Sequence, residues 1–226
     1  MNLYPSDIVY TPVHADTKLI DQTVFPEKYK RELLRIKFKN KNKDTITFIM
    51  MNPSKATSTH MDDTIENIIK FLSRTPLTVV NNKHLKIKDI GTLEVVNLFP
   101  FYRTNSAELK SDIETLQSHL DSGFFTNLIN SNHETIKRSI VNAKYIVLAW
   151  GLPTLVNYNI YFNEIIKTLD FVREQKKKFI FTLKTNGREA LSKFGNPYHP
   201  VAKTLEGLVS CDISKHNEII VKGSSK

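Results

Sequence analysis

An apolar run that ends abruptly in an Asn-Pro-Ser turn constrains this chain more than any other feature. Residues 47–51 read Thr-Phe-Ile-Met-Met, a composition typical of a buried strand, and Asn52-Pro53-Ser54 follow at once. Proline has no amide hydrogen to give to a sheet and restricts the residue before it, so the chain should leave the sheet at Asn52. Asn-Pro is also an ordinary turn dipeptide. The pattern nevertheless predicts Asn52 at the carboxyl end of a central strand, where open α/β sheets usually bind ligands.

Three later runs have the same form. Residues 92–97 end at Asn97, residues 145–151 end in Trp150-Gly151, and residues 178–183 precede a loop that contains His199-Pro200. Helical patterns separate these runs, over residues 62–72, 106–120, part of 124–142 and 162–172. Strands that alternate with helices predict crossover connections and a mostly parallel sheet.

We therefore expect an α/β fold, a three-layer α/β/α sandwich with a central, mostly parallel, four-stranded sheet. Nothing in residues 1–226 reads as a linker, so one domain is expected. Residues 1–44 would supply an N-terminal arm and a hairpin, in which residues 31–38 pair with the central strand, and residues 45–210 the core. Residues 76–91 read as a loop or an irregular strand pair, and residues 202–209 as a short helix.

Charge and cysteine content narrow the class of function. The 32 Lys and Arg residues exceed the 23 Asp and Glu residues, giving a net charge of +9. Such an excess suits a polyanion such as nucleic acid, although a solvated lysine surface explains the charge equally well. Cys211 is the only cysteine, which excludes an intrachain disulfide and cysteine-rich metal sites. The apolar runs are too short to span a membrane, so we expect a cytoplasmic protein with no membrane partner.

Because the carboxyl ends of neighbouring parallel strands share one rim, the four strand ends should meet at one pocket. The amide of Asn97 can both donate and accept, as reading a base edge requires, but it can equally cap a turn. Trp150 is expected in the core or the pocket wall rather than in catalysis. Asp62 and Asp63 could bind a metal, but a helix-opening cap is the favoured interpretation.

The ordered motifs resemble those of the uracil-DNA glycosylase superfamily. Its first motif reads roughly Gly-x-Asp/Asn-Pro-Tyr/Gly/Ser, a central strand ends in Asn, a Leu-Trp-Gly strand end follows, and the last motif reads His-Pro-Ser or Asn-Pro-Ser. The set Asn-Pro-Ser-x-Ala, Asp-x-Thr, Val-Val-Asn-Leu-Phe, Ala-Trp-Gly and His-Pro more closely resembles an uncharacterised-domain family, placed as a divergent branch of that superfamily. It is also similar to glycosylase-like proteins of staphylococcal cassette elements. The resemblance covers residues 45–208 and implies a uracil-DNA glycosylase-like fold.

The resemblance implies roles for individual residues. Asn52 looks like the residue that positions the attacking water, Asn97 like the uracil reader, and His199 like the donor to uracil O2. Pro53 and Ser54 would border the base, with Ser54 where fast enzymes carry a Tyr that excludes thymine. The stacking aromatic is not fixed by the motifs, and its candidates are Phe71, Phe99 and Phe101.

The chain also departs from the superfamily pattern. Met50 replaces the Gly of the first motif, and Val201 replaces the Ser after His-Pro. No Leu occupies the usual position of the wedge that enters the DNA stack, which leaves Lys203 or Leu205 as candidates. The residues expected to contact DNA are Lys55, Pro200, Val201, Lys203 and Leu205.

The leading hypothesis is a monofunctional uracil-DNA glycosylase, a monomer that needs no metal and no cofactor. Its partners would be uracil-containing DNA, single- or double-stranded, and a proteinaceous glycosylase inhibitor. A second hypothesis keeps the fold without catalysis, as a module that binds DNA or protein. A third is another base-processing or nucleotide hydrolase, although the sequence has no Walker loop, no Gly-x-Gly-x-x-Gly and no zinc-deaminase signature.

Overall fold

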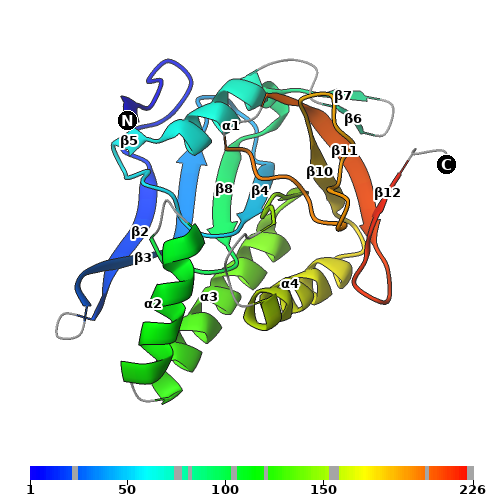
Figure 1. Ribbon diagram of the computed structural model, residues 1–226. Helices are drawn as coiled ribbons and strands as arrows, with labels where there is room; N and C mark the ends of the chain where they lie inside the picture. Colours follow the sequence, from blue (N-terminus) through cyan, green and yellow to red (C-terminus); the bar gives the residue numbers. More distant parts are fainter. Residues whose placement is uncertain are drawn as a thin grey trace.

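The computed structural model describes residues 1–21, 25–73, 78–80, 83–102, 106–119, 122–152, 158–201 and 204–222. In this part of the chain an eight-stranded mixed sheet forms the centre of the molecule (Figure 1). Its strands, in spatial order, are β12 (Ile219–Val221), β11 (Leu205–Ile213), β10 (Phe179–Thr185), β9 (Tyr145–Leu148), β4 (Thr45–Met50), β8 (Thr92–Asn97), β3 (Phe25–Lys37) and β2 (His14–Asp21).

The predicted sheet architecture is wrong. Over the described residues the sheet has eight strands rather than four, and four of its seven strand pairs are antiparallel. The three parallel pairs join β10, β9, β4 and β8 at its centre. Antiparallel strands extend both sides of this group, because segments expected to be an irregular arm and a helix form strands instead. Two short pairs lie outside the sheet, β1 (Asn2–Leu3) with β5 (His60–Met61) and β6 (Thr78–Val80) with β7 (Lys83–Leu85).

The predicted hairpin between residues 31–38 and the central strand is also wrong. β3 pairs with β8 and β2, whereas β4 pairs with β8 and β9, so β8 lies between the two expected partners. The start of β8 enters this space at Gly91, whose amide bonds Asp44 O (2.8 Å) and whose carbonyl accepts from Phe38 N (2.9 Å). A Cβ at Gly91 would lie 1.9 Å from Asn42 O, so only glycine fits this approach.

The predicted helix over residues 202–209 is replaced by β11. Leu205 and Leu208 are both buried, a three-residue spacing that mimics a helix. The register explains the spacing: Thr185 pairs with Leu205 while Lys184 pairs with Gly207, so Glu206 is an extra residue in β11. Such a bulge turns two residues three apart toward the same face of the sheet.

The other four predicted helices are confirmed, with small shifts at their ends. They are α1 (Asp63–Ser73), α2 (Ser106–His119), α3 (Ser122–Asn142) and α4 (Tyr158–Arg173), and a short 3-10 helix η1 (Ile87–Asp89) follows β7. Asp62 caps α1, since its Oδ1 accepts from Ile65 N (3.0 Å). No helix in the described ranges is long and apolar enough to cross a membrane.

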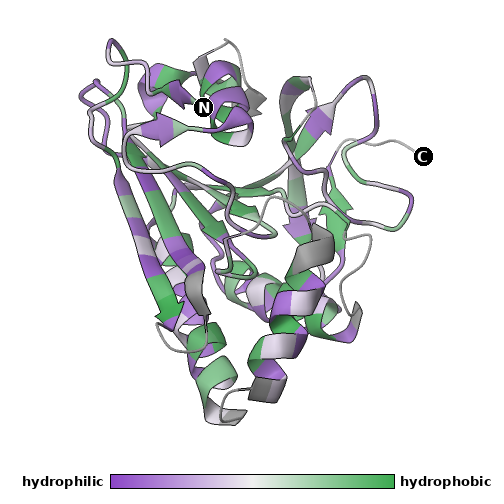
Figure 2. Ribbon diagram, turned by 60° about the vertical axis from the view of Figure 1, so that its left-hand side comes forward, coloured by the Kyte–Doolittle hydropathy of each residue, from purple (hydrophilic) through white to green (hydrophobic). Residues whose placement is uncertain are grey.

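Two hydrophobic clusters, one on each face of the sheet, hold the helices in place. α1 packs with Phe48 and Val95 on one face. The other three helices pack with Ile49 and Val96 on the opposite face (Figure 1). Neighbouring strand residues alternate between the two clusters, as the pleat of a strand requires. Hydrophobic residues accordingly predominate in the central strands (Figure 2), although β8 also carries the buried Glu94 and Asn97.

Candidate functional site

A cavity of about 490 Å³ lies at the carboxyl ends of the parallel strands. β4 leads into its wall at Met51 and Asn52, and β9 at Trp150 and Gly151. The start of α1 closes one side, and the loop after β10 brings His199 to it. The residues that line this cavity are Met1, Met51, Asn52, Ser54, Lys55, Asp62, Asp63, Thr64, Trp150, Gly151, Leu152, His199 and Val201.

The loop that carries Asn52 is fastened by its backbone from several sides. The Ala56 carbonyl accepts hydrogen bonds from Arg31 Nη1 and from Tyr102 Oη (2.6 Å). The Ala56 amide donates to Asp62 Oδ2 (3.1 Å), and Tyr4 Oη donates to the Thr57 carbonyl (2.9 Å). The same carboxylate therefore caps α1 and holds this loop, which fixes the loop against the start of the helix.

Arg31 is a fully buried cation beneath this loop. Its guanidinium lies 5.4 Å from the centre of the Tyr102 ring. Burial lowers the pKa of Arg31, while Tyr102, Asp62 and Tyr4 oppose that change by favouring its charged form. Burial also raises the pKa of Tyr102, so this phenol keeps the proton that it donates to Ala56. The loop thus rests on a buried polar cluster rather than on apolar packing alone.

His199 approaches the end of β9 closely. Gly151 has φ +76°, and a Cβ on it would lie 3.0 Å from His199 Cβ. The Gly151 amide bonds the Pro197 carbonyl (3.0 Å), which ties the histidine loop to the end of β9. His199 Nδ1 accepts from the Val201 amide (3.1 Å), so in a neutral ring the proton is on Nε2. This tautomer presents Nε2–H as a hydrogen-bond donor.

A residue of α1 holds the other side of the histidine turn. Asn67 Nδ2 donates to the carbonyl of Pro200 at 2.7 Å. Because α1 also starts at the carboxylate that holds the Asn52 loop, the two motif loops share this helix as a support.

Asn97 lies at the end of β8, directly beside Met50 of β4 in the parallel register. Its side chain is fully buried, and neither its Oδ1 nor its Nδ2 has a hydrogen-bond partner among the described residues. By strand alternation it shares the face of Val95, which is also the α1 face. It does not line the cavity. A buried amide without partners costs about 1–3 kcal/mol of stability per unsatisfied group. A purely structural role for Asn97 does not explain this cost.

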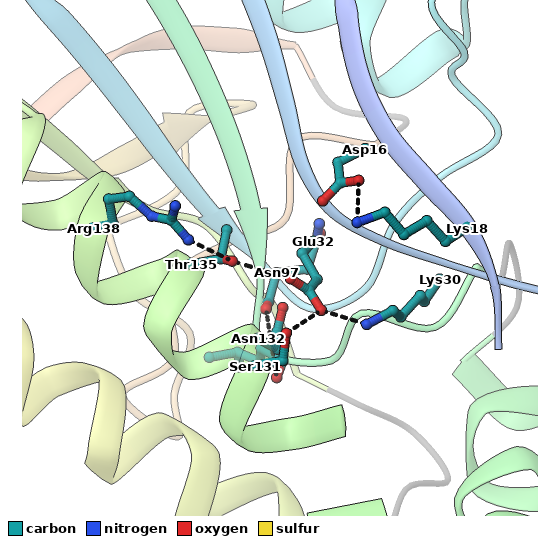
Figure 3. Close-up of polar contacts among 10 residues, drawn as sticks. Asp16, Lys18, Lys30, Glu32, Asn97, Ser131, Asn132, Thr135 and Arg138 are labelled. Atoms are coloured by element: carbon teal, nitrogen blue, oxygen red, sulfur yellow. Dashed lines mark hydrogen bonds and ion pairs between the residues drawn. The ribbon is translucent and has the colours of Figure 1, made fainter. Parts of the chain in front are cut away.

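The backbone at Asn97 is held from α3 (Figure 3). Asn132 Nδ2 donates to the carbonyls of Asn97 (2.8 Å) and Leu98 (3.1 Å). Beside it, the buried Glu32 carboxylate accepts from Ser131 Oγ (2.9 Å) and Thr135 Oγ1 (3.1 Å). Lys30 Nζ adds an ion pair to Glu32 at 2.7 Å. These contacts join β3 to α3 and fix where β8 ends.

Two cavity residues also have buried polar atoms without a partner in the described part of the chain. They are Ser54, through Oγ, and Trp150, through Nε1. The expectation that Trp150 lies in the core or the pocket wall is confirmed. Lys55 and Val201 line the cavity with exposed side chains, whereas Pro53 and Pro200 are buried behind the loops.

The structure does not bring the remaining predicted residues to the cavity. Phe71, Phe99 and Phe101 are all buried, the first on the sheet-facing side of α1 and the other two in the cluster on the opposite face. Leu205 is 2% exposed in β11, where a side chain cannot reach a DNA stack, so it is not a wedge. Lys203 lies outside the described residues.

The supports of the two loops could not be predicted from the sequence. Arg31, Tyr102 and Asn67 hold the loops through contacts with backbone carbonyls, and such contacts leave no periodic signal in a sequence. No group of three or more His, Cys, Asp or Glu side chains that could hold a metal occurs within the described ranges.

The model of a family described as a protein of unknown function, DUF1643, matches residues 31–201. The chain belongs to this family. The match starts at Arg31 and ends at Val201, so it contains both motif loops, Arg31, Tyr102 and Asn67, whereas Met1 and Tyr4 lie before it. No curated protein and no solved structure matches the chain.

Proposed function

We propose that this DUF1643 protein is a monofunctional uracil-DNA glycosylase, which hydrolyses the N-glycosidic bond of a uracil turned out of DNA and leaves an abasic site. The observation that carries the proposal is that Asn52 and His199, far apart in the sequence, line one cavity. Its volume of about 490 Å³ is within the range of small-molecule sites. Their meeting in one cavity supports the roles that the resemblance to the glycosylase superfamily implies for them.

The donor geometry suits the proposed chemistry. Breaking the bond builds positive charge on the sugar and negative charge on the departing uracil. A preorganised donor at the uracil oxygen stabilises that transition state more than the ground state. With Nδ1 of His199 occupied by the Val201 amide, Nε2–H is the donor for uracil O2. Asn52 would hold the attacking water through its amide, because an oxocarbenium-like sugar needs only a positioned nucleophile.

Asn97 would read the uracil edge. Its amide offers a donor and an acceptor that match uracil O4 and N3–H, and cytosine would leave both mispaired. Since this amide is buried and does not line the cavity, we expect the cavity wall at Met51 to move when the base enters. Binding would then supply the partners that the amide lacks in the free protein.

The experiment is excision of uracil from labelled oligonucleotides, single-stranded or paired with G or A, read as strand cleavage after alkali. Thymine and cytosine substrates serve as base controls. Asn52→Ala and His199→Ala should each lower excision steeply. Lys37→Ala, on the exposed side of β3, is the matched variant that should not. Absence of any released base at high concentrations of folded protein would refute the glycosylase.

A second candidate, a module that binds DNA without catalysis, is favoured by one observation. Asn97 does not line the cavity, and Met50 beside it replaces the glycine of the superfamily motif. A bulky side chain there can close the base site. DNA binding that persists without base release would support this second function.

A further inference from the structure

The loop between β10 and β11 presents an exposed aromatic side chain next to the candidate site. Phe194 is 64% exposed, more than any other Phe, Tyr or Trp among the large exposed hydrophobic residues of the described chain. One exposed apolar residue needs no explanation by itself. Three further observations give this one a function.

The first observation is that the tip carrying Phe194 is rigidly built. Ser192 N donates to Asn196 O (2.8 Å), and Gly195 N returns to Ser192 O (2.9 Å). Asn196 adds two bonds, from its amide to Ser192 Oγ (3.2 Å) and from its Nδ2 to Phe194 O (3.3 Å). Gly195, at φ +75°, supplies the left-handed residue of the turn. The backbone that carries the exposed ring is therefore a closed, hydrogen-bonded turn.

The second observation is the position of this tip. Its base is the bridge between Leu191 and Pro197, and the Pro197 carbonyl bonds the amide of Gly151 in the cavity wall. Pro197 follows Phe194 by three positions, a reach of at most about 11 Å. The tip thus starts at the cavity wall, two residues before His199.

The third observation is the chemistry around the tip. Leu152 and Val201, both in the cavity lining, are 37% and 45% exposed, so the cavity itself also presents apolar side chains to solvent. Lys193 Nζ lies 4.9 Å from the centre of the Phe194 ring, and Lys55 lines the cavity. An exposed aromatic ring with a lysine beside it fits a polymer with flat bases and anionic phosphates.

We propose that Phe194 is the side chain that enters the base stack when this protein binds duplex DNA, with Lys193 contacting the adjacent phosphate. Apolar wedges between base steps are a recurrent means of unstacking a duplex. This inference rests on the proposed function, in which a base must leave the stack before its bond is cut. It places the wedge before the histidine in the sequence, on the turn at residues 192–196, rather than after it.

The test compares single-stranded with duplex substrate, because only the duplex requires unstacking. Phe194→Ala should lower single-turnover excision from a U·G duplex about tenfold and leave excision from the single strand within about twofold. Phe194→Trp should restore the duplex rate. The matched control is Tyr10→Ala, which removes an aromatic 56% exposed with Lys39 Nζ 5.7 Å from its ring centre, but outside the candidate site. It should change neither rate.

A second readout does not depend on catalysis. With 2-aminopurine beside the uracil, the wild type should raise the fluorescence of the duplex, and Phe194→Ala should abolish that rise. Equal loss on both substrates, or no loss on either, overturns the wedge, and an unchanged fluorescence rise in Phe194→Ala does so independently. If the wild type releases no base, the proposed function fails, and the fluorescence alone decides the wedge. A tip that leaves every DNA signal unchanged would instead be a contact for a protein.

Discussion

His199 packs directly against the backbone of Gly151, because a glycine leaves free the space that a side chain would occupy. A Cβ at Gly151 would lie 3.0 Å from His199 Cβ and 3.6 Å from its backbone nitrogen. The same glycine has φ +76° and bonds the Pro197 carbonyl. Position 151 therefore sets how far the histidine donor stands from the end of β9.

Gly151→Ala should lower uracil excision by about ten- to a hundredfold, since a displacement of about 1 Å in a catalytic group has effects of this size. The Ala also strains the backbone by about 1–2 kcal/mol. Gly187→Ala separates the two effects, because Gly187 has φ +67° but nothing lies within 4 Å of its added Cβ. Comparable melting temperatures with activity lost only in Gly151→Ala are expected. Equal activity of the two variants would contradict the packing role.

Asn67→Asp should weaken excision about tenfold, because a carboxylate cannot donate to the Pro200 carbonyl and would repel it. We expect the loss in kcat rather than in KM, since the change moves the histidine turn and not the DNA surface. Steady-state kinetics on a uracil oligonucleotide measure both. Lys70→Ala, on the exposed face of the same helix, is the control. A change confined to KM would argue against this role.

The order of the central strands and helices along the chain could be predicted from the sequence. The antiparallel strands that flank them in the sheet could not. Apolar runs that stop at Asn52 and Asn97 identified two parallel strand ends, because proline chemistry is local. β11 was missed because a bulge at Glu206 gives Leu205 and Leu208 a helical spacing. Such a bulge depends on the pairing with β10 and leaves no local mark.

The site could be predicted only in part, because local sequence signals mark strand ends but not which face of the sheet a side chain occupies. Asn52 and His199 do line one cavity, whereas the buried aromatic candidates do not. Whether Phe99 faces the cavity or the core depends on which face of the sheet it occupies after β8 ends, and this is decided by packing with α3. Arg31 lies within the segment predicted to pair with the central strand, and that pattern does not reveal its neighbours in space, Ala56 and Tyr102.

Arg31→Met should destabilise the fold by about 2–3 kcal/mol, because the Ala56 carbonyl loses a buried donor and Asp62 loses a nearby positive charge. For a chain of this size that corresponds to a fall of about 5–10 °C in Tm. Tyr102→Phe should cost about 1 kcal/mol, the typical value of a hydrogen bond such as the one it donates to the same carbonyl. Calorimetry measures both, with Lys37→Met as the exposed control on β3. A Tm unchanged in Arg31→Met would contradict the role of the buried cluster.

Cys211 should make the protein less stable at alkaline pH. Burial raises the pKa of its thiol from 9.0 to about 12 in the folded state. The unfolded thiol therefore loses its proton first, and its contribution to stability declines as pH rises from about 9 toward 12. Urea midpoints at pH 8 and pH 10.5 should differ less in Cys211→Ala than in the wild type. The buried tyrosines contribute the same pH dependence to both proteins, so the difference between the proteins reports the thiol. The native thiol should also react with a disulfide reagent only after unfolding.

Asn52→Asp should accelerate uracil excision, the opposite of the effect expected from Asn52→Ala. A carboxylate orients the water as the amide does, and its charge also stabilises the positive sugar of the transition state. The cavity already contains Asp62 and Asp63, so a third carboxylate should have a raised pKa and the gain should grow as pH rises from 5 to 8. Single-turnover rates across this range measure the gain, and the His199→Ala background should remove most of it. If Asn52→Asp excises no faster than the wild type at pH 8, Asn52 does not hold the water.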